Sequence, residues 1–303
     1  MPHAPQALIA ERLAVEQHGK GHQKNMKYAI CNETFENWPF EKAFALAADL
    51  GYSGIEFAPF TINKQADAIS AEERATIRGQ IEDAGLQTVG LHWLLAFTEG
   101  LYLTSPEEPV RDRTGTYLAE LARLCSDLGG RILVLGSPQQ RNLLPGVSLE
   151  QGMDLAADVI RRAVPAFEEH NVMLALEPLS PAEGDFLLTA DQGIDLMRRV
   201  DSEHVRLHLD VKAMSSESRP IPDIIRDAAP YLIHFHANDA NLRGPGMGKI
   251  DFVPILKALQ EIDYQGWVCV EVFDYKPSPE YIASESIKYL EACLREVVEA
   301  AGE

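Results

Sequence analysis

The chain has 303 residues, of which 46% are hydrophobic and 24% are charged, as expected of a globular protein with a large core. Its formal net charge of −19 argues against a nucleic-acid partner and against an anionic membrane surface, because both need clustered Lys and Arg. No apolar run approaches the roughly 20 residues of a membrane span, and residues 1–25 lack the apolar stretch of a signal peptide. These features predict a cytoplasmic protein.

Residues 1–25 are rich in Gln, His and Ala, and we expect them to form a partly helical N-terminal extension. Such an extension could pack on a second copy of the chain, so a homo-oligomer is a further hypothesis. Four cysteines are scattered without a C-x-x-C pair, which predicts reduced, mostly buried thiols. They are Cys31, Cys125, Cys269 and Cys293.

From Lys27 onward, short apolar or β-branched runs alternate with amphipathic stretches of helical period. The pattern predicts strands at 27–31, 54–57, 87–92, 131–135, 172–176, 205–209, 232–235 and 267–270. It predicts helices near 40–50, 70–84, 110–128, 148–170, 189–199, 222–229, 252–262 and 279–300. The helix near 70–84 starts with Ser70 and Glu73 in capping-box spacing.

Eight consecutive βα units favour a closed barrel over an open, doubly wound sheet. The strands are almost continuously apolar, as in parallel sheets that are buried on both faces. No G-x-G-x-x-G motif follows the first strand, which disfavours a dinucleotide-binding fold. We therefore predict an α/β protein, a (β/α)₈ TIM barrel, with residues 26–303 as a single domain behind the short N-terminal extension.

Polar side chains end four neighbouring strands of this predicted barrel. Glu177 follows the fifth strand, Asp210 the sixth, His236 the seventh and Glu271 the eighth. Active sites of such barrels lie at the carboxyl ends of the strands, so the four side chains should converge on one point.

Three buried carboxylates and an imidazole need a positive charge, because burying unpaired charge is costly. A divalent metal supplies it, and three oxygen ligands with one nitrogen suit Mn²⁺, Mg²⁺ or Co²⁺ better than thiophilic ions. The alternative is that each residue forms a separate ion pair or helix cap. Four equivalent positions in consecutive units favour a single metal site.

Three further histidines lie near the same barrel mouth. His208 and His234 precede site residues by two positions, so alternation places them on the same barrel face at a deeper level. We expect His234 to be a packed, hydrogen-bonded residue rather than a ligand. His92 ends the third strand and could bind a substrate hydroxyl, or it could be a structural histidine next to Trp93.

The segments around these ligands resemble the xylose isomerase-like barrels, over about residues 27–294. That group includes ketose 3-epimerases, hydroxypyruvate isomerase, inosose dehydratase and endonuclease IV. The resemblance implies that the four strand-end residues are the metal ligands. It is carried by Glu177-Pro178-Leu179, Leu209-Asp210, His236-Ala237-Asn238-Asp239 and Val270-Glu271.

The epimerase branch of the family implies a mechanism. Glu177 and Glu271 would flank the substrate and transfer a proton through a cis-enediolate, with a substrate carbonyl and a neighbouring hydroxyl on the metal. The resemblance also implies that Glu183 and Arg243 contact the substrate. The alternative for Arg243 is a solvated charge in its loop. Glu56, at the end of the second strand, is a further candidate for the pocket.

Two positions depart from the family pattern. Ala213 stands where epimerases usually carry a histidine. This departure predicts either that the preceding Lys212 takes over a polar, substrate-binding role or that the substrate is bulkier or modified. The loop 246–251 lacks the histidines of additional metal sites, which disfavours DNA repair.

These residues predict a metal-dependent sugar or keto-polyol isomerase or epimerase whose partner is a small carbohydrate. One alternative is a lyase that uses the same enolate, either a dehydratase of the inosose type or a 3-keto-sugar eliminase. Another is a sugar-binding subunit without catalytic activity.

Overall fold

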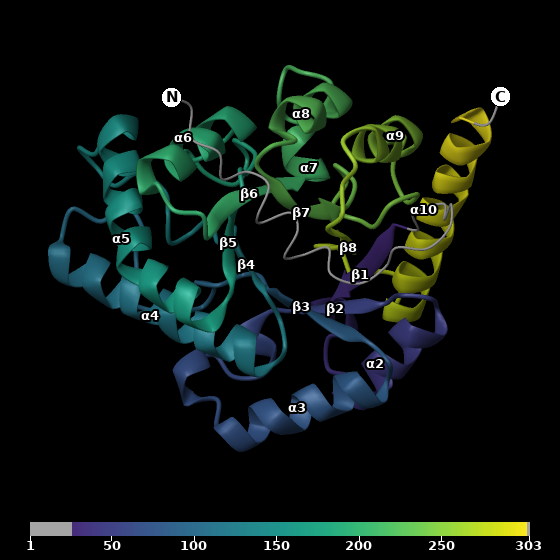
Figure 1. The fold of residues 1–303 in the computed structure, drawn as a ribbon, viewed down its shortest axis with the longest axis horizontal. Coiled ribbons are helices and arrows are strands. Elements are labelled where there is room, and N and C mark those ends of the chain that lie inside the picture. Colours follow the sequence, from purple (N-terminus) through teal and green to yellow (C-terminus); the bar gives the residue numbers. More distant parts are fainter. Residues whose placement is uncertain (1–25, 302–303) are drawn as a thin grey trace, which may run out of the picture.

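Eight parallel strands pair in sequence order and close into a barrel in the computed structural model, which describes residues 26–301. The eighth strand pairs with the first, so that Lys27 lies opposite Trp267 and Ile30 opposite Val270. Figure 1 shows the strands at the centre of the molecule. They are β1 (Lys27–Cys31), β2 (Gly54–Phe57), β3 (Gln87–Leu91), β4 (Ile132–Leu135), β5 (Met173–Leu176), β6 (Val205–Asp210), β7 (Leu232–Ala237) and β8 (Trp267–Val270).

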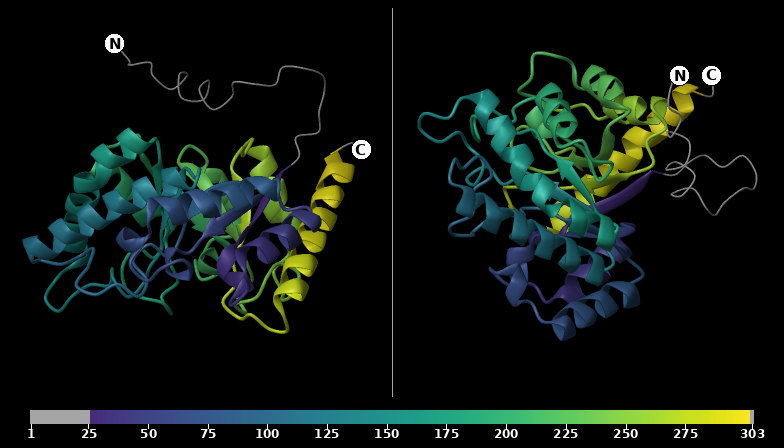
Figure 2. Two further views of the ribbon diagram at one scale, coloured as in Figure 1. Left: turned by 90° about the horizontal axis from the view of Figure 1, so that it is seen from below. Right: turned by 60° about the vertical axis from the view of Figure 1, so that its left-hand side comes forward.

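Helices follow the strands and form an outer layer around the barrel (Figures 1 and 2). The longer ones are α2 (Phe40–Asp49), α3 (Ala71–Asp83), α4 (Glu108–Asp127), α5 (Leu149–His170), α6 (Ala190–Val200), α8 (Ile221–Ala228), α9 (Val253–Glu261) and α10 (Pro279–Ala301). Short helical turns are η1 (Asn32–Phe35), η2 (Pro59–Thr61), η3 (Ala66–Ala68) and α7 (Val211–Met214). The predicted single-domain (β/α)₈ barrel is confirmed.

Local sequence chemistry explains where α3 begins. The Ser70 hydroxyl accepts a hydrogen bond from the backbone N–H of Glu73, and the Glu73 carboxylate accepts one from the backbone N–H of Ser70. This reciprocal capping box satisfies two N–H groups that the first helical turn would otherwise leave unpaired. The predicted start of this helix is confirmed.

Two strands extend further toward the barrel mouth than the sequence pattern predicts. β6 runs to Asp210 and β7 runs to Ala237, and Asp210 pairs with His236 across the two strands. The apolar pattern stops earlier because Asp210 and His236 are polar. Backbone pairing continues through them, so strand geometry positions Asp210 and His236 beside each other.

The barrel interior combines apolar packing with buried polar groups. All four cysteines are buried, as predicted, and none of them forms a disulfide in the described part of the chain. Cys31 and Cys269 face each other with their Sγ atoms 3.6 Å apart. Glu56, His234 and His236 are each fully shielded from solvent inside the barrel.

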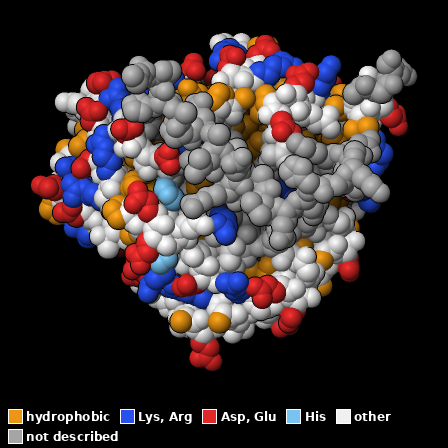
Figure 3. Space-filling model, in the orientation of Figure 1, with side chains coloured by type: hydrophobic (Ala, Val, Ile, Leu, Met, Phe, Trp, Pro, Cys, Tyr) orange, Lys and Arg blue, Asp and Glu red, His pale blue; other side chains and the backbone are white. Residues whose placement is uncertain are grey.

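The described surface carries acidic and basic side chains side by side. Figure 3 shows them interleaved around the periphery of one face, without a basic patch among the described residues of that face. Within residues 26–301, every helix is too short or too polar to cross a bilayer. The expectations for residues 1–25, a partly helical extension and a contact with a second copy, fall outside the described residues.

Candidate metal centre and active site

The four predicted ligands lie at the carboxyl ends of adjacent strands, as predicted from the sequence. Glu177 directly follows β5, Asp210 ends β6, His236 lies near the end of β7 and Glu271 directly follows β8. All four side chains are buried. The parallel register places Asp210 beside His236, and His236 beside Cys269, two residues before Glu271.

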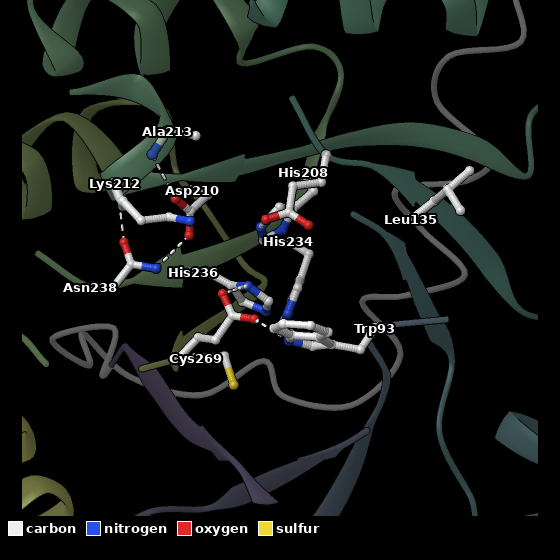
Figure 4. A network of polar contacts seen from close by, with 12 residues as sticks. Trp93, Leu135, His208, Asp210, Lys212, Ala213, His234, His236, Asn238 and Cys269 are labelled. Carbon is white, nitrogen blue, oxygen red and sulfur yellow. Dashed lines mark hydrogen bonds and ion pairs between the residues drawn. The ribbon is translucent and has the colours of Figure 1, made fainter. Parts of the chain in front are cut away.

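The potential ligand atoms of Glu177, His208, Asp210 and His236 all lie within 4.8 Å of one another. The structure therefore brings three of the four predicted ligands together and adds His208, which sequence reasoning placed one level deeper. Figure 4 shows the imidazoles of His208 and His236 near Asp210. Alternation along β6 did predict that His208 shares a barrel face with Asp210.

Glu271 lies beside this group and is held by two neighbours. Its Oε2 is 3.1 Å from Nδ1 of His236, and its Oε1 accepts a hydrogen bond of 3.1 Å from Nε1 of Trp93. Although burial opposes ionisation, His236 lowers the pKa of Glu271 to about 2. Glu271 is therefore an ionised carboxylate with a fixed orientation.

The site carries an excess of buried negative charge. Burial, together with the carboxylates of Glu271 and Asp210, raises the pKa of Glu177 to about 8. Burial also raises the pKa of Asp210. Both nitrogens of His208 lack a hydrogen-bond partner among the described residues, with Nε2 3.8 Å from Oε1 of Glu177. A divalent cation fits this site. It would neutralise the repelling carboxylates and bind an imidazole nitrogen that has no other partner.

A cavity of about 90 Å³ opens onto this centre, and both predicted catalytic glutamates reach it. Trp93 and Phe273 supply aromatic surface, which suits the C–H faces of a sugar ring or chain. The residues that line the cavity come from loops that follow several strands. They are Trp93, Gly136, Ser137, Pro138, Glu177, Leu179, Glu183, Glu271 and Phe273.

Gly136, directly after β4, makes room for the Glu177 carboxylate. A Cβ atom at this position would overlap Oε2 of Glu177. Substitution of Gly136 by Ala should therefore displace Glu177, weaken Mn²⁺ binding at least about 10-fold and leave the barrel folded. Isothermal titration with Mn²⁺ and circular dichroism would measure the two effects.

Gly79 offers a matched control for this substitution. A Cβ at this position in α3 meets no atom within 4 Å, so Gly79→Ala should leave Mn²⁺ binding unchanged. It should also stabilise the helix by about 0.5–1 kcal/mol. Equal Mn²⁺ affinity in the Gly136→Ala and Gly79→Ala variants would show that Glu177 does not hold the cation.

Lys212 and Glu183 form an ion pair at the edge of the cavity. The Lys212 ammonium lies 4.0 Å from the centre of the Phe273 ring, and the side chain is buried. Glu183 also accepts hydrogen bonds from the backbone N–H and the hydroxyl of Ser180. Although burial opposes the charge, Asp210 and Glu183 raise the pKa of Lys212. Both predicted substrate-binding residues therefore adjoin the metal centre in fixed positions.

The three remaining predicted contacts lie away from the cavity lining. Nε2 of His92 is 2.9 Å from Oε2 of Glu33, and the His92 ring is 1% exposed. Arg243 is paired with Asp274 in the loop after β7. Glu56 is fully buried beneath His236. In this conformation a substrate in the cavity would meet none of these three side chains directly.

Sequence reasoning missed two residues that shape the site. Trp93 has a left-handed backbone (φ 53°) and directs its indole N–H at Glu271. Arg141 is fully buried and donates hydrogen bonds to the backbone carbonyls of Glu177, Leu135 and Leu187. The signal for Trp93 in the sequence is its position next to His92, the histidine predicted to end the third strand. Arg141 lies in a loop, and no pattern in the sequence indicates its contacts.

The chain belongs to the xylose isomerase-like TIM barrel family, whose model matches residues 44–293. It is 30% identical over 263 residues to the D-psicose 3-epimerase of Agrobacterium fabrum, covering 82% of this chain and 85% of that protein. It is 26% identical over 266 residues to a probable ketose 3-epimerase of Synechocystis sp., covering 82% and 89%. A crystal structure of D-psicose 3-epimerase in the presence of D-fructose matches with a TM-score of 0.73 at 25% identity, covering 87% and 90%.

These relatives are sugar epimerases, which form a class of isomerases. The predicted family is confirmed, and so is the prediction that the chain is an enzyme of the isomerase class. The predicted lyase alternative is not favoured by these relatives.

Proposed function

We propose that this chain is a divalent-metal-dependent ketose 3-epimerase acting on a free sugar. The observation that carries the proposal is that Glu177 and Glu271, from different strand ends, line one cavity beside a cluster of metal-ligating side chains. The names of the relatives, which include a D-psicose 3-epimerase, support the position of the reaction on the sugar.

Glu177, Asp210, His236 and Glu271 would hold the cation, and His208 is a further candidate ligand because it lies in the same cluster. When bound, the cation supplies a Lewis acid that stabilises negative charge on substrate oxygens. Mn²⁺, Mg²⁺ and Co²⁺ all suit this mixture of carboxylates and imidazole.

The two glutamates would perform the proton transfer. One carboxylate removes the proton at C3 of the ketose, and the C–H electron pair moves toward the C2 carbonyl to form a cis-enediolate. The other glutamate, in its protonated form, returns a proton to the opposite face of C3, and the carbonyl is restored with C3 inverted. The indole N–H of Trp93 donates a hydrogen bond to the Glu271 carboxylate and holds it in one orientation during this exchange.

The charges around the cavity favour a sugar without a phosphate group. Among the described residues, its lining contains Glu177, Glu183 and Glu271 but no Lys or Arg. The neighbouring Lys212 is already paired with Glu183. A phosphate would bring further negative charge into this environment with no free cationic side chain to receive it.

An isotope experiment separates the epimerase from the lyase. With Mn²⁺ in D₂O, we expect D-psicose and D-fructose to interconvert with one solvent deuterium entering at C3 and no other change of mass. NMR would locate the label and mass spectrometry would count it. A panel of other ketoses and keto-cyclitols belongs in the same assay. Loss of water or of an aglycone would instead identify a lyase, and turnover of none of these compounds would contradict the proposal.

A further inference from the structure

A buried carboxylate lies directly beneath the metal centre. Glu56, on β2, is 0% exposed, and its Oε2 is 2.9 Å from Nε2 of His234 and 3.1 Å from Nε2 of His236. Both histidines project from β7 into the barrel interior. Glu56 therefore crosses the barrel from β2 to meet two imidazoles of one opposite strand.

The two nitrogens of His236 face different groups. Nε2 faces Glu56, whereas Nδ1 faces Glu271, one of the proposed ligands. An imidazole that binds a metal must offer a lone pair, so its other nitrogen carries the proton. In this site, a proton on Nε2 hydrogen-bonded to Glu56 leaves the Nδ1 lone pair directed at the cation.

Glu56 is placed to hold the proton on Nε2 of His236. It is absent from the described cavity lining, so it does not reach a substrate there. An ionised carboxylate inside a barrel is costly unless hydrogen-bond donors contact it, and Oε2 of Glu56 has three such neighbours: Nε2 of His234, Nε2 of His236 and, at 3.8 Å, Sγ of Cys31. His234 also restricts Glu56 to one orientation, because the same oxygen serves both rings.

We propose that Glu56 is a positioning residue that fixes the tautomer and ring orientation of His236 for metal binding. This assignment rests on the proposed function, because it requires His236 to be a ligand. It also assigns a different role to Glu56 from the substrate contact predicted from the sequence. Carboxylates that hold metal-bound histidines in this way typically contribute 10–100-fold to metal affinity.

A second buried pair provides a matched control. Glu33 in η1 lies 2.9 Å from Nε2 of His92, and both side chains are nearly inaccessible to solvent. Glu33 contacts none of the four predicted ligands in the described hydrogen bonds and ion pairs. Replacing Glu33 thus removes a buried carboxylate that lies beside an imidazole but makes no contact with His236; the neighbouring His92 ring packs edge-on against His236, with ring centroids 5.9 Å apart.

The test measures Mn²⁺ binding to the whole chain by isothermal titration, with the melting temperature of the metal-free protein recorded separately. We expect Glu56→Gln to raise the Kd for Mn²⁺ about 10–100-fold, and Glu56→Asp, which keeps the charge, to raise it less. Glu33→Gln should leave the Kd within about 2-fold of the wild-type value, even where it lowers the melting temperature. At saturating Mn²⁺, Glu56→Gln should recover a kcat within several-fold of wild type.

The outcomes separate this assignment from the proposed function. A wild-type chain that binds Mn²⁺, with an unchanged Kd in Glu56→Gln, overturns the role of Glu56 alone. Equal losses of affinity in Glu33→Gln and Glu56→Gln also overturn it, because they indicate a general effect on the barrel core. A wild-type chain that binds no Mn²⁺ overturns both. If Glu56→Gln fails to fold, the Kd for Mn²⁺ of Glu56→Asp decides instead. A Kd equal to that of the wild type, together with a reduced kcat, overturns the assignment.

Discussion

Replacement of Glu271 by Gln is expected to lower kcat for C3 epimerisation by about 10²–10⁴-fold, and replacement of Glu177 by Gln should have a similar effect. An amide fills the same space as a carboxylate and can still offer an oxygen to a cation, but it cannot accept the C3 proton. Epimerisation needs one proton transfer on each face of C3. Loss of either group therefore stops the full reaction.

Deuterium exchange at C3 tests the two-glutamate mechanism more specifically than a loss of activity does. Each single variant should still exchange the C3 proton of one epimer with D₂O, because the remaining glutamate can remove it and return it on the same face. The two variants should act on opposite epimers. NMR of D-psicose and D-fructose incubated separately with each variant would measure this selectivity.

The control for both variants is Glu296→Gln, which changes an exposed carboxylate on α10. It should retain wild-type kcat. Isothermal titration with Mn²⁺ should accompany each assay, so that lost proton transfer is distinguished from a lost cation. Epimerisation at the wild-type rate in either Glu177→Gln or Glu271→Gln would rule out the two-glutamate mechanism.

Removal of divalent ions with a chelator is expected to abolish epimerisation and to lower the melting temperature by several degrees. Glu177, Asp210 and Glu271 repel one another inside the barrel, and burial with this repulsion already raises the pKa of Glu177 to about 8. A ligand present at 100 times its Kd stabilises the folded state by about 2.7 kcal/mol. For a chain of this size, that corresponds to a shift on the order of 4 °C.

Titration of the chelated protein with single metals would test this expectation. Activity and melting temperature should rise together on addition of Mn²⁺, Mg²⁺ or Co²⁺, and the metal that restores most activity identifies the preferred cofactor. Ca²⁺ is a useful comparison because it adopts larger, more flexible coordination shells. Full activity after exhaustive chelation, with no bound metal by elemental analysis, would contradict a metal-dependent reaction.

The architecture followed from the sequence because its signals are local. Apolar runs of strand length, amphipathic stretches of helical period and the Ser70 capping box each depend on neighbouring residues, and all of them recur in the structure. The predicted strands and helices differ from the structure at their ends, and the short turns η1, η2, η3 and α7 are not predicted. The turn α7 was missed because it spans four residues and is capped by the Asp210 side chain, which was assigned to the metal instead.

For the site, the sequence alone determined that Glu177, Asp210, His236 and Glu271 share the mouth of one barrel, because carboxyl ends of parallel strands always meet at the same end. Only the tertiary structure decided which atoms lie within bonding distance. Side-chain directions and the stagger between strands bring His208 into the ligand cluster, place Trp93 on Glu271 and seat Glu56 beneath His236. Those contacts join residues up to 180 positions apart, a separation over which no local pattern carries information.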